Sequence, residues 1–189
     1  MTDVLTLTNV TKSFGALKVT DDVSFSVPKG QALGIIGPNG AGKSTLFNLI
    51  TGNILPDAGT ITLLGQTVTR SPAMDRVRMG VGRSFQIPQP FEGLTTFENL
   101  LTAAAHGQNK REAEVADQCV AILRDTELLP KANQLAGTLS LLDRKRLELA
   151  RAMATGPELL LLDEIAGGLT EGECHALVAT IRGLHAKGI

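Results

Sequence analysis

The stretch from Gly37 to Thr45 has the residue types and spacing that bind phosphate. It fits G-x-x-x-x-G-K-[ST], the pattern of a phosphate-binding loop. Without side chains at its glycines, the chain can wrap closely enough for backbone N–H groups to surround an anion. Lys43 would place its ammonium near the β- and γ-phosphates of a nucleotide, and Ser44 would offer its hydroxyl to Mg²⁺. The expected nucleotide contacts are Gly37, Pro38, Asn39, Gly40, Ala41, Gly42, Lys43, Ser44 and Thr45.

A pair of acidic residues, Asp163 and Glu164, follows the apolar run 159–162. At the carboxyl end of a strand, Asp163 would hold Mg²⁺, and Glu164 would polarise a water molecule for attack on the γ-phosphate. The alternative is a solvated carboxylate pair, because many strands end in acidic residues. Together with the phosphate loop, the pair predicts the second half of a nucleotide site.

Strands and a helix must position these two groups. The apolar run 32–36 predicts a buried strand that leads into the phosphate loop. Apolar residues at helical spacing after the loop predict a helix that Gly52 ends. A strand, a glycine loop and a helix in this order aim the helix N-terminus at an anion. The run 159–162 predicts a second buried parallel strand.

The rest of the chain predicts a small antiparallel sheet and a set of helices. Expected strands are 4–10, 23–27, 60–63, 66–68 and 81–86. Expected helices begin at Ser71 as N-cap, at the Thr95/Glu98 capping box, near Lys110, at Ser140 and near Glu171. The fold class is therefore α/β, a P-loop NTPase core with an N-terminal antiparallel β subdomain. The core comprises 1–85 and 147–189, and a helical insert comprises 86–146.

Composition narrows the classes of function. The 189 residues suffice for one domain with a real core, and the net charge of −1 gives no reason to expect a nucleic-acid partner. No apolar run approaches the ~20 residues that a membrane span needs, and we expect no signal peptide and a cytoplasmic protein. Cys119 and Cys174 lack the spacing of metal ligands and are expected to be reduced, with Cys119 on the apolar face of a helix.

These motifs resemble those of the nucleotide-binding subunit of ATP-binding-cassette transporters, and more narrowly those of branched-chain amino acid importers. Residues 37–45 match the family's Walker A loop and 159–164 its Walker B strand. The resemblance implies that Gln86 is the Q-loop glutamine, which senses Mg²⁺ and the γ-phosphate and faces the membrane partner. It also implies that Phe14 stacks on adenine, although a buried core Phe is the alternative.

The chain departs from the family's pattern in the signature, where Leu-Ser-Gly-Gly-Gln is replaced by residues 139–143, Leu-Ser-Leu-Leu-Asp. In the family this helix end binds the γ-phosphate of ATP held by the other subunit. Leu141 and Leu142 should obstruct that approach, and Asp143 would add a negative charge costing ~1–4 kcal/mol at ~4 Å. Ser140 would still act as cap and phosphate donor.

The resemblance implies an ATPase that uses ATP and Mg²⁺ to power amino acid import, and that lies on the inner face of the cell membrane. Its implied partners are transmembrane permease subunits and a second ATPase subunit, either a copy or a related chain. It would contact neither the transported solute nor nucleic acid. Two alternatives remain: a nucleotide-binding module without turnover of its own, and a P-loop kinase or other soluble NTPase built on the phosphate loop alone.

The last residues, Ala186 to Ile189, predict that a further strand should follow the final helix. In the family that strand lies between the two parallel strands named above, and a histidine beyond it contacts the γ-phosphate. None of His106, His175 and His185 fits that role, and all three are expected on the surface. We therefore expect a chain truncated at its C-terminus, which would fold poorly and hydrolyse little ATP by itself because buried backbone groups would lack partners.

Overall fold

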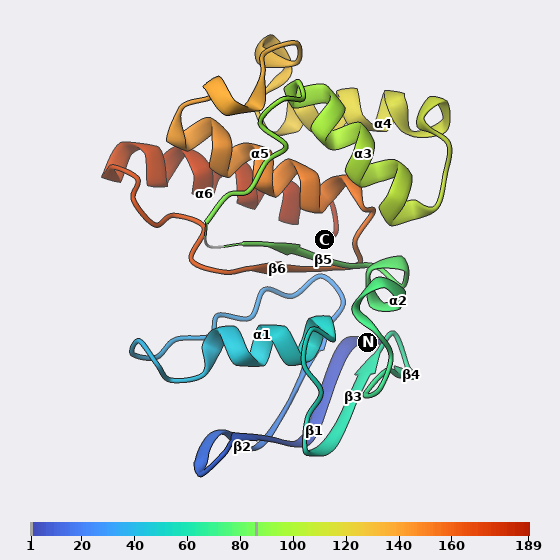
Figure 1. Cartoon of the computed structure of the whole chain (residues 1–189), viewed down its shortest axis with the longest axis vertical. Coiled ribbons are helices and arrows are strands. Elements are labelled where there is room, and N and C mark those ends of the chain that lie inside the picture. Colours follow the sequence, from blue (N-terminus) through green and yellow to red (C-terminus); the bar gives the residue numbers. More distant parts are fainter. Residues whose placement is uncertain (1, 86) are drawn as a thin grey trace. The chain divides into compact units, whose positions relative to one another are not determined.

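The computed structural model describes residues 2–85 and 87–189. The chain divides into two compact units, Met1–Val81 and Gly82–Ile189, and each is described here by itself. Their elements are labelled in Figure 1. The sequence-based division into a core (1–85 and 147–189) and a helical insert (86–146) stays a prediction.

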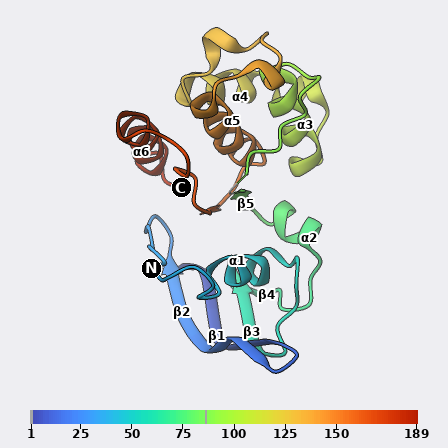
Figure 2. The ribbon, with the colours of Figure 1, turned by 60° about the vertical axis from the view of Figure 1, so that its left-hand side comes forward.

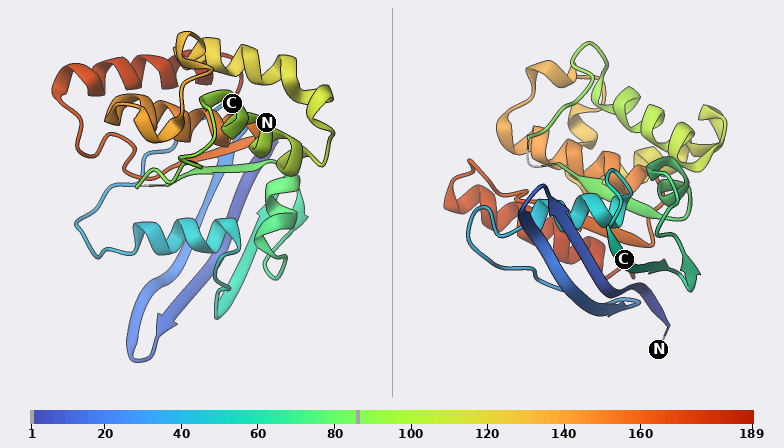
Figure 3. Two further views of the ribbon diagram at one scale, coloured as in Figure 1. Left: turned by 45° about the horizontal axis from the view of Figure 1, so that its top comes forward. Right: turned by 60° about the horizontal axis from the view of Figure 1, so that its bottom comes forward.

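The first unit is built on a four-stranded antiparallel sheet in the order β2-β1-β3-β4. β1 (Asp3–Phe14) and β2 (Leu17–Pro28) form a long hairpin (Figure 3), and β3 (Ala58–Leu63) and β4 (Gln66–Thr67) a short one. Leu5 lies opposite Leu63 and Leu7 opposite Ile61, and all four side chains are buried. The predicted antiparallel sheet is therefore confirmed, with its first two strands longer than expected.

Two helices complete this unit, α1 (Lys43–Thr51) and α2 (Ala73–Arg78). Arg76 of α2 is completely buried and donates hydrogen bonds to the carbonyl oxygens of Leu49 and Ile50 at 2.7 and 2.9 Å. A cation at the C-terminal end of a helix satisfies carbonyl groups that have no partner within the helix. Arg76 thus fixes the end of α1 opposite the phosphate loop. Ser71 is not the cap that the sequence predicted, because Pro72 occupies the N-cap position of α2.

The predicted strand 32–36 is wrong. Residues 31–38 form no regular element, and Leu33 and Ile36 are 53% and 95% exposed. A strand exists only where its backbone N–H and C=O groups pair with a neighbour. The four strands of the first unit pair with one another and leave these residues outside the sheet. An apolar run indicates only that its residues tend to be buried. It does not show whether a neighbouring strand is present to pair with them.

The second unit contains the pair β5 (Val81–Ser84) and β6 (Leu159–Leu162). β6 is a strand as predicted, but only Leu161 in it is buried. Its helices are α3 (Thr96–Gln108), α4 (Glu112–Asp125), α5 (Leu141–Ala154) and α6 (Glu171–His185), with short 3₁₀ turns at Leu129–Lys131 and Ala136–Thr138. Figure 2 shows α3, α4 and α5 gathered together.

The helices of the second unit enclose an apolar core that includes Leu100, Cys119, Leu123, Leu147, Leu149 and Leu177. The Thr95/Glu98 capping box is confirmed at the start of α3, and Thr170 and Glu173 form another at α6. Cys119 is buried and free, and burial raises the pKa of its thiol to about 11. The three histidines are exposed, as expected. Within the described residues, no helix has both the length and the apolar character that crossing a bilayer requires.

Candidate nucleotide site

The phosphate loop precedes α1 directly, with Gly42 as the N-cap of the helix. Gly42 has a φ of 89°, and a Cβ atom placed there would lie 2.7 Å from the carbonyl oxygen of Val19 in β2. Both the backbone conformation and the neighbouring strand therefore require glycine at this position. The first turn of α1 carries no acidic residue, so the partial positive charge of the helix N-terminus is not opposed.

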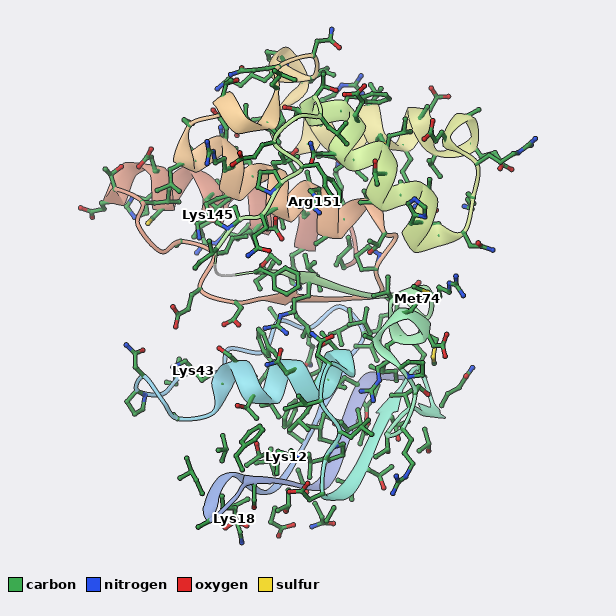
Figure 4. The ribbon with its side chains drawn as sticks, in the orientation of Figure 1. Lys12, Lys18, Lys43, Met74, Lys145 and Arg151 are labelled. Atoms are coloured by element: carbon green, nitrogen blue, oxygen red, sulfur yellow. The ribbon has the colours of Figure 1, made fainter. Side chains whose placement is uncertain are left out.

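Lys43 lies at the base of this loop (Figure 4). Its ammonium donates hydrogen bonds to the carbonyl oxygens of Gly37 at 2.7 Å and Pro38 at 2.9 Å. The lysine therefore closes the loop on itself. Ser44 is exposed at the first turn of the helix, where its hydroxyl can reach a ligand.

Phe14 ends β1 in the same unit as the phosphate loop. Its side chain is 51% exposed, so the alternative of a buried core residue is excluded. The ammonium of Lys12 lies 5.6 Å from the centre of the ring. An exposed ring beside a cation is suited to stacking on a base, although stacking on adenine stays a prediction.

Asp163 follows β6 in the second unit and is 8% exposed. The guanidinium of Arg83, in β5, contacts its carboxylate at 3.1 Å, and both side chains are about nine-tenths buried. Sequence reasoning missed this partner. The sequence did contain an indication of it, because an arginine within the short strand 81–84 needs a negatively charged partner when the strand is buried.

We predict that Arg83→Gln destabilises the protein, because it leaves the Asp163 carboxylate buried without a cation. Removing one partner of a buried ion pair costs about 3–5 kcal/mol, or roughly 10 °C in melting temperature for a domain of this size. Mg²⁺ should raise the melting temperature of this variant more than that of the wild type, since it supplies the missing charge. Calorimetry with and without Mg²⁺ measures both effects, and the exposed Arg124→Gln on α4 is the control. Equal melting of Arg83→Gln and wild type would contradict the prediction.

Glu164 is exposed and has a φ of 44°, in the left-handed region that non-glycine residues seldom adopt. Such a backbone costs about 1–3 kcal/mol and persists only where surrounding structure enforces it. Lys145 on α5 is 2% exposed. Burial lowers the pKa of Lys145, and the carboxylates of Glu148 and Glu164 oppose that shift.

Ser140 is the N-cap of α5 as predicted, and its hydroxyl accepts a hydrogen bond from the backbone N–H of Asp143. The hydroxyl also donates to the Asp143 carboxylate at 2.6 Å. To act as a phosphate donor, Ser140 must therefore first give up this bond.

The predicted repulsion of an anion by Asp143 stays a prediction, but the structure shows that this carboxylate has cationic partners. Its side chain is 5% exposed, pairs with Lys131, and lies 3.7 Å from Arg146. Burial would raise the pKa of Asp143, but hydrogen bonds from Lys131 and Ser140 leave it below its ordinary value. The carboxylate thus turns inward because two cations of its own unit neutralise it.

The predicted site residues are divided between the two units. Phe14 and 37–45 lie in the first unit, and Ser140, Asp163 and Glu164 lie in the second. Gln86, predicted to sense Mg²⁺ and the γ-phosphate, lies outside the described residues, and its role stays a prediction. Arg83, Lys145 and the other charged residues of α5 are additions that motif matching did not find.

Comparisons with known proteins place these features in a family. Residues 20–167 match the family model described as "ABC transporter". A probable branched-chain amino acid transport ATP-binding protein LivG of Methanocaldococcus jannaschii is 35% identical, over 99% of this chain and 77% of that protein. The high-affinity branched-chain amino acid transport ATP-binding protein BraF of Pseudomonas aeruginosa is 36% identical, over 96% of this chain and 78% of that protein.

Solved structures agree with the sequence comparisons. MJ1267, an ATP-binding cassette of an ABC transporter, superposes with a TM-score of 0.90 at 34% identity. The alignment covers 100% of this chain and 79% of that one. The ADP conformation of MJ1267 gives the same TM-score at 33% identity, covering 100% and 79%.

Proposed function

Since this chain belongs to the ABC transporter family, we propose that it binds ATP and hydrolyses it to drive amino acid import through a membrane permease. The observation that carries the proposal is the phosphate loop, where Gly42 begins α1 and Lys43 lies at the base of the loop. The printed names of the relatives support a branched-chain amino acid as the transported solute.

The residues present fit a nucleotide with Mg²⁺. Glycine at position 42 keeps the loop narrow, and the exposed Ser44 hydroxyl in the same unit is an oxygen ligand of the kind that Mg²⁺ prefers. When bound, Mg²⁺ would neutralise charge on the phosphates. Lys43 would exchange its bonds to the loop carbonyls for bonds to phosphate oxygens, and the exposed ring of Phe14 would hold the base.

In this proposal Glu164 is the general base. Its carboxylate is exposed, as a group that must meet water has to be, and its backbone has a φ of 44°. It would take a proton from the attacking water. The family match and the names of the relatives do not favour the first alternative, a nucleotide-binding module that does not hydrolyse ATP. The second alternative, a P-loop kinase, does not explain why the chain matches this family.

The proposed partners are transmembrane permease subunits and a second ATPase subunit, with the chain in the cytoplasm on the inner face of the membrane. The loop after β5 carries Ile87 and Phe91, which are 71% and 50% exposed. Exposed apolar side chains in one loop suit the docking of a permease helix. Leu94, further along the same loop, is half-buried.

The test is the ATPase activity of the full-length protein alone and with its permease in vesicles. We expect hydrolysis that depends on Mg²⁺ and that the permease stimulates. Phe91→Asp should reduce assembly with the permease tenfold or more, because a charge would replace an apolar contact. The exposed Leu17→Asp, at the start of β2 in the other unit, is the control. Absence of hydrolysis in the assembled complex would refute the function, and normal assembly of Phe91→Asp would refute the docking surface.

A further inference from the structure

The hairpin of β1 and β2 carries the exposed Phe14 at its tip, where Phe14 lies opposite Leu17. The same hairpin passes the start of α1, because the carbonyl oxygen of Val19 in β2 would lie 2.7 Å from a Cβ atom at Gly42. Both features belong to the first unit. The conformation of this hairpin therefore sets where the ring of Phe14 lies relative to the phosphate loop.

Strand pairing holds the tip of this hairpin incompletely. The register between β1 and β2 shifts twice within residues 10–13. Such irregularities interrupt the ladder of backbone hydrogen bonds. On the other side of β1, the register with β3 ends where Thr11 lies opposite Ala58. Residues 12–14 extend beyond that point, so a contact other than strand pairing must fix them.

Asp57, directly before β3, supplies that contact. Its carboxylate accepts a hydrogen bond from the Lys12 ammonium on Oδ1 and another from the backbone N–H of Ser13 on Oδ2, both at 2.7 Å. Its own backbone N–H donates to the carbonyl oxygen of Thr11 at 2.9 Å. The hydrogen bonds from Lys12 and Ser13 also lower the pKa of the Asp57 carboxyl. Three consecutive residues of β1 are thus bound to one aspartate.

Lys12, labelled in Figure 4, extends this contact to the ring of Phe14. Its ammonium lies over the ring, 5.6 Å from the centre. Its side chain is 17% exposed, although that of Asp57 is 46% exposed. Lysine side chains are flexible, and the bond to Asp57 limits where this ammonium can lie. A ring with a cation over one face can stack on a base through the other face.

We infer that Asp57 is a positioning residue that fixes the ring of Phe14 for a nucleotide base. This inference rests on the proposed function, in which Phe14 holds the base. Asp57 acts through the Lys12 ammonium and the Ser13 backbone, and it is no ligand of the nucleotide itself. Its substitution should therefore weaken the binding of the base and leave the binding of the phosphates unchanged.

Calorimetric titration of the full-length protein with two ligands separates these effects. Mg²⁺–ATP carries a base and phosphates, whereas Mg²⁺–tripolyphosphate carries phosphates alone. In Asp57→Asn the affinity for Mg²⁺–ATP should fall about fivefold, the lower end of what stacking on an aromatic ring contributes per base. The affinity for Mg²⁺–tripolyphosphate should not change. Asn has a single oxygen, whereas the carboxylate uses one oxygen for each of its two bonds.

Asp21→Asn is the matched control. Asp21 lies on β2 of the same hairpin and pairs with Lys18 at 3.0 Å, so the substitution removes the same charge from a different ion pair. This variant should bind both ligands as wild type does. A merely structural role of Asp57 would lower the melting temperature and weaken both ligands equally, because it would not distinguish the base from the phosphates.

Hydrogen exchange without nucleotide tests the contact with the tip directly. In Asp57→Asn the backbone amide of Ser13 should exchange about tenfold faster than in wild type, because it loses a hydrogen bond to a charged group. In Asp21→Asn that amide should exchange as in wild type. Should Asp57→Asn not fold, Lys12→Gln replaces it in the titrations, with the same selective loss of affinity for Mg²⁺–ATP.

Two results would overturn the inference. One is an unchanged affinity of Asp57→Asn for Mg²⁺–ATP, and the other is an equal loss of affinity for both ligands. Phe14→Ala distinguishes these from a failure of the proposed function. If Phe14→Ala binds Mg²⁺–ATP as tightly as wild type, the ring does not hold the base and the proposed role of Phe14 is wrong. If Phe14→Ala weakens Mg²⁺–ATP but Asp57→Asn does not, the inference alone fails.

Discussion

Replacing Glu164 by Gln should abolish ATP hydrolysis while ATP binding persists. Gln keeps the size and much of the hydrogen bonding of Glu but cannot accept a proton, and general-base catalysis contributes about 10²–10⁴-fold to a rate. The residue is exposed, so the change should leave folding intact. Its backbone already has a φ of 44°, and Gln meets the same strain as Glu.

The measurement is phosphate release by the full-length protein in its assembled transporter, together with the dissociation constant for ATP. Glu158→Gln, an exposed glutamate just before β6, is the matched control and should turn over as wild type does. Wild-type turnover by Glu164→Gln would exclude Glu164 as the base. Loss of both binding and turnover would point instead to a disturbed site.

Lys43→Ala should weaken the binding of Mg²⁺–ATP tenfold or more. A charge-assisted hydrogen bond contributes about 1.5–3 kcal/mol, which corresponds to roughly 10- to 150-fold in affinity. The carbonyl oxygens of Gly37 and Pro38, which Lys43 now binds, lie on exposed residues and can turn to water. The loss should therefore fall on the nucleotide and leave the melting temperature nearly unchanged.

Calorimetric titration with Mg²⁺–ATP measures this effect. Lys18→Ala serves as control, because Lys18 is an exposed lysine of β2 that pairs only weakly at the surface with Asp21. If the dissociation constant for Mg²⁺–ATP were unchanged in Lys43→Ala, residues 37–45 would not be the phosphate-binding loop. A large fall in melting temperature would mean that the loop needs the lysine for its own folding.

Local signals predicted much of the fold. The predicted strand 23–27 is confirmed within β2, where Val23, Phe25 and Val27 are less exposed than Ser24 and Ser26 between them. Capping at Thr95 and Ser140 was also predicted correctly, because a cap depends on residues only three positions apart. The strand 32–36 failed because strand pairing depends on distant residues that a local pattern does not include.

Motifs predicted the candidate site less completely than the fold. Gly42 is required where the motif places it, by both its φ and the nearness of Val19. Arg83, which pairs with Asp163 from 80 positions away, belongs to no motif that the sequence analysis used. Asp143 was judged by its charge alone, and its two cationic partners were visible only in three dimensions.

The hydrogen bonds of Lys43 to its own loop have a consequence for turnover. When a product leaves, the Lys43 ammonium can return to the two carbonyl oxygens, so its lost hydrogen bonds to phosphate are replaced by hydrogen bonds to the loop. The loop can take back the ammonium as the phosphates leave, which lowers the barrier to emptying the site. The same contacts limit the affinity of the loop for the product nucleotide, which favours its release before the next ATP binds.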